Sequence, residues 1–160
     1  MTDTLKSRIY PVVIALLLLV IAAMIYMFII VGSTEKTEDG RVAIVLEPGE
    51  RVLMLREMRD FVVGLQLIAD ALSRDDMKEV AKAARTMGAA RTHDVPITMM
   101  GKLPIEFKTR ALGVHSAFDT IAMDAEAFTI PKRTLAQLSG VLQNCVACHA
   151  GYRVTVPMSR

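Results

Sequence analysis

The chain has 160 residues, which is enough for one compact domain and one additional segment. Its charge is nearly balanced, with 19 Lys and Arg against 17 Asp and Glu. The chain lacks the clustered excess of basic residues that binding to nucleic acid would need. The mean hydropathy of +0.38 is high for a soluble protein. One apolar run near the N-terminus explains this value.

Val12–Val31 is a run of 20 residues without a charge. At about 1.5 Å per helical residue it would span roughly 30 Å, the thickness of the hydrocarbon core of a bilayer. The positive-inside rule keeps the N-terminus cytoplasmic and exports the rest, because basic residues precede the run and acidic ones follow it: Lys6 and Arg8, then Glu35, Glu38 and Asp39. A cleaved signal peptide is the alternative, but its apolar region usually has about 7–15 residues and ends at a small-residue site, which this run lacks. We therefore expect residues 1–31 to form a cytoplasmic N-terminus and an uncleaved transmembrane anchor.

A polar segment and a short apolar run separate this anchor from the rest of the chain. We expect residues 32–47 to form a tether, in which Val42–Leu46 is either a lone strand or an extended arm laid on the domain. From residue 48 onward, apolar residues recur at helical spacing.

Four amphipathic helices are expected in residues 48–160. The first is expected at about Pro48–Leu72 and the fourth from Pro131 onward, each with proline in its first turn. The second is expected after a capping Asp75 or Asp76, and the apolar stripe of the third runs over Phe107–Phe128. Thr92–Pro104 contains two prolines and a glycine and is expected to be a loop. The fold class predicted is all-α, an antiparallel four-helix bundle preceded by one N-terminal transmembrane helix.

The only two cysteines belong to the sequence Cys145-Val146-Ala147-Cys148-His149. In a Cys-x-x-Cys-His motif, two thiols add across the two vinyl groups of haem and the histidine gives iron an axial nitrogen. On a helix these positions share a face, and Cys145 and His149 continue the predicted apolar stripe, so we expect the haem inside the bundle. We therefore predict one covalently attached haem c.

Two other uses of the cysteines fit the sequence less well. A zinc site would need further ligands, and only His93 and His115 remain. A thioredoxin-like redox pair would need a βαβ context, which the helical pattern does not provide.

The segment from Cys145 to Arg153, Cys-Val-Ala-Cys-His-Ala-Gly-Tyr-Arg, follows a four-helix pattern and resembles the C-terminal signature of the cytochrome c′ family. The resemblance covers roughly residues 48–153. It implies a haem between the helices, with His149 as the proximal iron ligand and Arg153 beside the proximal face. Typical members of that family are soluble, whereas this chain carries an anchor.

The resemblance also implies that one residue of the first helix covers the other face of the haem. An apolar residue there leaves iron five-coordinate and open to NO and CO, and a methionine closes the sixth position and favours electron transfer. Met58 is central on the stripe and is the first candidate for a distal iron ligand, with Met54 as the second. If no protein ligand binds, Leu55 would be the covering residue.

These observations predict a membrane-anchored mono-haem c-type cytochrome that transfers electrons. Its haem domain would lie in the periplasm, on the bacterial inner membrane, and its partners would be membrane-bound or soluble redox proteins. A homodimer, or a place in a larger membrane complex, is compatible with the sequence. The sequence offers no acid–base or nucleophilic constellation, so we do not expect an enzyme. A five-coordinate haem protein that binds NO or CO is the alternative.

Overall fold

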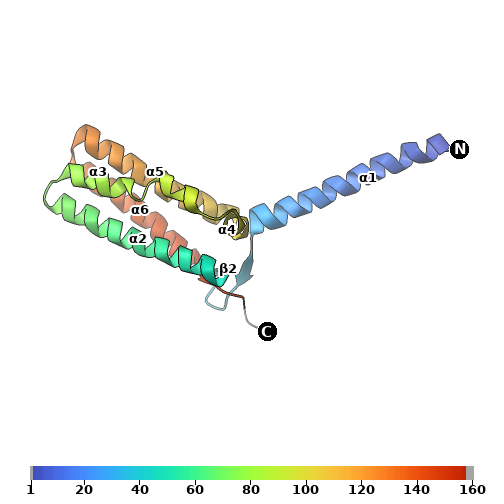
Figure 1. Cartoon of the computed structure of the whole chain (residues 1–160), viewed down its shortest axis with the longest axis horizontal. Helices are drawn as coiled ribbons and strands as arrows, with labels where there is room; N and C mark the ends of the chain where they lie inside the picture. The colour runs from blue at the N-terminus through green and yellow to red at the C-terminus, as the bar shows by residue number, and fades with distance from the viewer. Residues whose placement is uncertain (1, 158–160) are drawn as a thin grey trace.

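The structure is a computed structural model that describes residues 2–157, with side chains from Ile9 onward. It is mostly helical, with a long N-terminal helix that projects from a helical domain (Figure 1). The α-helices are α1 (Thr2–Ile25), α2 (Pro48–Ser73), α3 (Met77–Arg85), α4 (Ile97–Lys102), α5 (Ile105–Phe128) and α6 (Pro131–Gly151). Two shorter helical segments are η1 (Tyr26–Val31), a π-helix, and η2 (Ala89–Asp94), a 3₁₀-helix.

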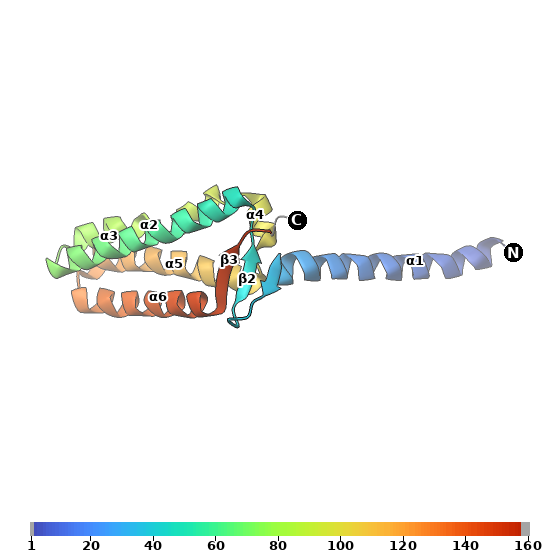
Figure 2. The same cartoon turned by 90° about the horizontal axis from the view of Figure 1, so that it is seen from below.

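The N-terminal helix is long and apolar enough to cross a membrane. α1 continues into η1, and the 23 residues Ile9–Val31 have a mean hydropathy of 3.2 with none of them buried in the protein. Such a helix exposes apolar side chains on every side, which is unfavourable in water and favourable in lipid. The expected anchor therefore forms one helix that stands apart from the domain (Figure 2).

The helix starts and stops follow the local sequence signals. α2 begins at Pro48, and the backbone N–H of Glu47 donates to the Glu50 carboxylate at 2.9 Å, as in a capping box. Asp76 caps α3 by accepting a hydrogen bond of 3.1 Å from the backbone N–H of Glu79. α6 begins at Pro131, as the sequence predicts.

The expected loop at Thr92–Pro104 is mostly helical in the structure. It contains the end of η2 and all of α4. Pro96 directly precedes α4, and Pro104 lies two residues after its end. Met99 and Leu103 are four residues apart and both are buried, so this short helix is held by packing. The prolines bound the helix and do not interrupt it.

The segment expected as a tether is part of the domain. It forms strands β1 (Thr34–Lys36) and β2 (Val42–Val45), which pair antiparallel, and β2 pairs in parallel with β3 (Tyr152–Thr155) at the end of the chain. Ala43, Ile44 and Leu46 are buried. The domain is therefore not entirely helical, because a three-stranded sheet in the order β1-β2-β3 closes one end of it.

Two hydrophobic clusters stabilise the domain. α3 packs against α2 and α5, and α5 packs against α6. The larger cluster lies among these four helices and includes Ile68, Val80, Met87, Phe118 and Ile121. The smaller one, called here the sheet-end cluster, joins the sheet to α2, α4 and α5 through Ile44, Leu46, Met54, Met99, Leu103 and Phe107.

Candidate haem site

The Cys-x-x-Cys-His motif occupies the last two turns of α6, directly before β3. The backbone N–H of Tyr152 caps the helix by donating to the carbonyl of Cys148. Tyr152 is also the first residue of β3 and pairs with Val42 of β2. The end of the helix is therefore fixed by the sheet, and the motif lies at the end of the domain from which the apolar helix leaves (Figures 1 and 2).

The two cysteines and the histidine differ in burial. Cys145 and Cys148 are half-buried, Cys145 against the larger cluster and Cys148 against the sheet-end cluster. His149 is exposed. The thiols therefore border the core, whereas the imidazole is open to a ligand from outside.

The buried face of α6 is displaced from the predicted stripe. Thr134, Leu138 and Val141 are buried and lead by steps of four and three to the cysteines. Leu135 is 60% exposed and Leu142 is 42% exposed, and both lie in the row that contains His149. Because consecutive residues are about 100° apart around a helix, the row of Thr134 and Val141 faces α5 and the row of Leu135 and Leu142 faces solvent.

Burial raises the pKa of both thiols. It raises the pKa of Cys145 above its ordinary value. It raises that of Cys148 too, although the positive charge of Arg110 on α5 opposes this shift. Free thiols at this site are therefore mainly protonated at neutral pH.

Tyr152 links the end of the motif to α5. Its hydroxyl donates to Glu106 at 3.1 Å, and its ring meets that of Phe107 edge-on with 5.4 Å between the centroids. Burial, followed by this hydrogen bond, raises the pKa of Tyr152 above its usual value. Nothing in the sequence near Glu106 indicates this contact, because Tyr152 lies 46 residues further along the chain.

The candidate distal residues lie on the N-terminal half of α2. Met54 is buried in the sheet-end cluster, and Met58 is half-buried against the same cluster that Cys148 borders. Leu55 is half-buried on the adjacent part of the helix. The structure thus brings Met58 and Cys148 to one cluster from two different helices.

Arg153 has a partner in the sheet region. It lies in β3 opposite Ala43, and its guanidinium Nη1 is 3.7 Å from Oδ2 of Asp39, on the turn between β1 and β2. Asp39 also binds Arg41, whose hydrogen bond is the main cause of the lowered pKa of Asp39. The side chain of Arg153 is 45% exposed.

The two other histidines have separate surroundings. His93 lies exposed in η2. His115 is buried, with Nδ1 2.7 Å from the carbonyl oxygen of Met87 and Nε2 4.0 Å from Oε1 of Glu57. Among residues 9–157, whose side chains the structure describes, no group of three or more His, Cys, Asp or Glu is placed to hold a metal ion.

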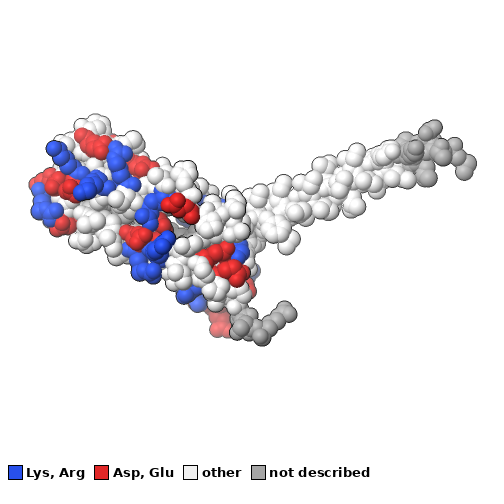
Figure 3. Space-filling model, in the orientation of Figure 1, with Lys and Arg blue, Asp and Glu red and all other residues white. Residues whose placement is uncertain are grey.

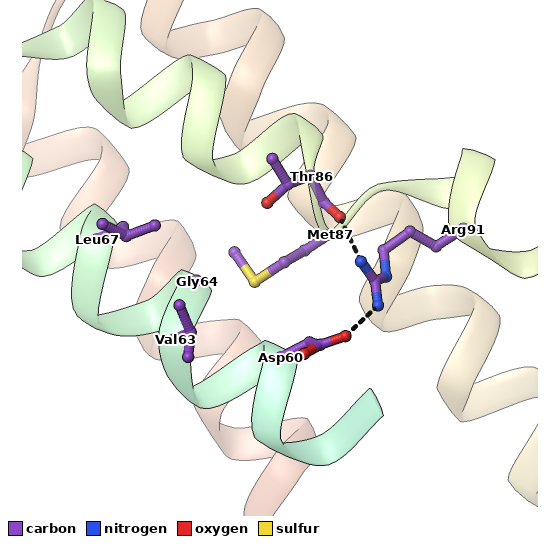
Figure 4. Close-up of a pocket in the computed structure, with 7 residues that line it drawn as sticks. All are labelled: Asp60, Val63, Gly64, Leu67, Thr86, Met87 and Arg91. Atoms are coloured by element: carbon purple, nitrogen blue, oxygen red, sulfur yellow. Dashed lines mark hydrogen bonds and ion pairs between the residues drawn. The ribbon is translucent and has the colours of Figure 1, made fainter. Parts of the chain in front are cut away.

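A surface cavity of about 260 Å³ lies between α2 and the end of α3 (Figure 4). Arg91 closes one side of it by donating to Asp60 at 2.7 Å and to Glu57 at 3.1 Å and 3.2 Å. Burial opposes but does not outweigh these bonds, which raise the pKa of Arg91. The cavity is therefore bounded by a neutralised cation, and the motif of α6 does not line it.

Comparisons with protein-family models, with curated proteins and with solved structures find no match to this chain.

Proposed function

We propose that this protein is a membrane-anchored c-type cytochrome with one covalent haem, and that it transfers electrons at the outer face of the bacterial inner membrane. The domain would be a four-helix bundle of the cytochrome c′ type, with a small sheet added at its membrane-proximal end. One observation carries the proposal: the last turns of α6 present two half-buried thiols beside an exposed imidazole, in the order Cys-x-x-Cys-His.

The residues around the motif fit a porphyrin. Leu142 and Val146 of α6 lie beside and within the motif and are 42% and 69% exposed. A flat apolar ring attached through Cys145 and Cys148 would cover apolar surface that otherwise contacts water. The bound haem would supply an iron that is reversibly reduced by one electron.

The attachment needs no oxidant. Each thiol would add across one vinyl group of haem, with sulfur bonding to one carbon and the proton going to the other. His149 would then serve as the proximal iron ligand, since its ring is exposed on the same two turns of helix.

A dithiol redox catalyst is less well supported by the same residues. Such catalysts need a cysteine with a lowered pKa, because the thiolate is the nucleophile. Here burial raises the pKa of both Cys145 and Cys148.

The position of the motif supports exchange of electrons near the membrane. The chain leaves η1 at Val31, enters β1 three residues later, and β1 belongs to the same sheet as β3, which follows the motif. An anchored site near the bilayer meets membrane partners at high effective concentration. Redox proteins in the membrane or in solution would be the partners.

The attachment is tested by expressing the full chain with a haem-attachment system. Haem should stay on the protein through acid–acetone extraction and denaturing electrophoresis. The Cys145→Ala/Cys148→Ala double variant should lose it, while the exposed-site control Val146→Ala should keep it. Loss of haem from the unmutated protein, or its retention by the double variant, would contradict the proposal.

The topology is tested separately in cells. Protease added after the outer barrier is opened should digest the haem domain, and mass spectrometry of the purified protein should find residues 1–31 still attached. An N-terminus beyond residue 31 would show that the apolar helix is a cleaved signal.

A further inference from the structure

The surface around α4 exposes apolar side chains that have no partner in the domain. Ile97 is 85% exposed, the largest fraction for any large hydrophobic side chain that the structure describes, and Ile105 is 40% exposed. From residue 95 to residue 105, Lys102 is the only charged residue. Its ammonium group is neutralised by Glu50 at 2.7 Å and Glu47 at 3.4 Å.

This surface lies where the apolar helix leaves the domain. The backbone N–H of Ser33 donates to the carbonyl of Lys102 at 2.8 Å. The preceding residue, Gly32, closely approaches the same carbonyl. α4 has six residues and is therefore about 9 Å long, so Ile97 lies within one short helix of the exit point. Figure 1 shows α4 beside the base of α1, and Figure 3 shows uncharged surface where they meet on that face.

We propose that Ile97 and Ile105 insert into the interfacial layer of the bilayer that α1 spans, so that the domain rests on the membrane through α4. The inference depends on the proposed membrane span of α1. The occupant of this surface is lipid and not a protein, because the surface is continuous with the apolar helix Ile9–Val31, whose own environment is lipid. Apolar side chains meet lipid favourably and water unfavourably, and the one cation of this segment, Lys102, is paired with Glu47 and Glu50.

This contact would fix the orientation of the haem motif. The sheet that joins the exit of η1 to β3 lies at the same end of the domain as α4. With α4 on the bilayer, the C-terminal end of α6 would be held close to the membrane surface and the opposite end of the bundle would point away. Electron exchange with a membrane-embedded partner would then occur at one fixed face.

The sequence contains no tryptophan, so a single introduced tryptophan reports its own environment. Full-length Ile97→Trp is reconstituted in phosphatidylcholine vesicles with brominated or unbrominated acyl chains. Bromine quenches tryptophan on contact, and the ratio of the two intensities cancels any quenching by haem. Val20→Trp in α1 and Leu135→Trp, about 21 Å along α6 from His149, are the reference variants.

We expect the quenched fraction of Ile97→Trp to be nearer to that of Val20→Trp than to that of Leu135→Trp. If Val20→Trp is quenched and Ile97→Trp is not, the docking is wrong and the span is right. If Val20→Trp is not quenched, the span and the docking both fail.

Tryptophan itself favours the membrane interface, so a tryptophan at position 97 would bias the result. A second reporter at position 105 leaves residue 97 available for substitution. In Ile105→Trp, the added substitution Ile97→Ser should lower the quenched fraction, because the contact loses its most exposed apolar side chain. The added substitution Leu135→Ser should leave it unchanged. Equal quenching with and without Ile97 would overturn the proposal.

Discussion

Met58 of α2 and Cys148 of α6 pack against the same sheet-end cluster, although 90 residues separate them in the chain. Cys148 is one of the proposed attachment points of the haem, and Met58 is half-buried. A haem attached to Cys148 would therefore border the cluster that Met58 also contacts. This shared contact is the structural observation that makes Met58 the distal residue to test first.

The first prediction concerns this methionine. If Met58 binds iron, ferric protein should be six-coordinate and low-spin, with the weak red charge-transfer band of a Met–iron bond, and reduced protein should bind CO slowly or not at all. Met58→Leu preserves volume and should abolish the band, lower the reduction potential and admit CO. Optical spectra with and without CO measure all but the potential, which needs a redox titration.

The matched control is Met54→Leu, one turn earlier in the buried part of the cluster. It should leave the spectrum and the CO response unchanged. An unmutated protein that is already high-spin and binds CO readily would show that Met58 only packs, and would favour the gas-binding function.

The helices were predictable because each carries its own local signals. Proline, capping aspartate and apolar periodicity place the starts of α2, α3 and α6 where the structure has them. The apolar helix was predictable from length and hydropathy alone. These properties belong to short stretches of sequence and need no knowledge of distant residues.

The sheet and α4 depend on distant residues. β2 pairs with β3 across more than 100 residues of chain, and nothing within Val42–Val45 reveals that partner. α4 is too short to be stable alone and is held by packing of Met99 and Leu103. The exposure of His149 was also missed, since two adjacent rows of α6 are both apolar and only the position of α5 decides which is buried.

Gly32 joins the apolar helix to the domain, and Gly32→Ala should destabilise that joint. Its φ of +68° disfavours any side chain, and a Cβ there would also lie 2.9 Å from the backbone of Leu103 and Pro104. We expect a loss of more than about 1–3 kcal/mol, the usual cost of backbone strain, because the steric clash adds to it. Gly40→Ala is the control, with a φ of +81° and nothing within 4 Å. Denaturant unfolding in mild detergent should rank the two variants, and equal losses would show that the contact with α4 is unimportant.

Gly64 allows α2 to approach the end of α3. A Cβ at this position would overlap the outer atoms of the Met87 side chain, which is 2% exposed and would have to shift within the cavity that both residues line. Gly64→Ala should therefore cost roughly 1–3 kcal/mol by overpacking. Gly113→Ala in α5, with nothing within 4 Å, should instead stabilise by about 0.5–1 kcal/mol through helix propensity. A stabilised Gly64→Ala variant would mean that Met87 repacks freely.

The last prediction concerns the ion pair between Glu50 and Lys102, which holds the start of α2 to the end of α4. Burial acts to raise the pKa of Glu50, but the hydrogen bond from Lys102, the hydrogen bond from the backbone N–H of Glu47 and the charge of Lys102 together outweigh it and leave the pKa below the ordinary 4.5. A carboxylate with a lowered folded pKa stabilises the protein above its unfolded pKa, and this contribution is lost as the pH falls through the folded pKa. In Lys102→Met, burial acts on Glu50 without its partner, so the variant should be clearly less stable than the unmutated protein at neutral pH. The difference should shrink well below pH 4.5, where Glu50 becomes protonated in both proteins.

The control is Lys82→Met, which removes the ion pair between Lys82 and Glu79. The side chains of this pair are 73% and 52% exposed, so the variant should change stability little at either pH. Denaturant unfolding of the three proteins at the two pH values measures this, and a Lys102→Met deficit that stays constant with pH would show that the lysine contributes packing and not charge.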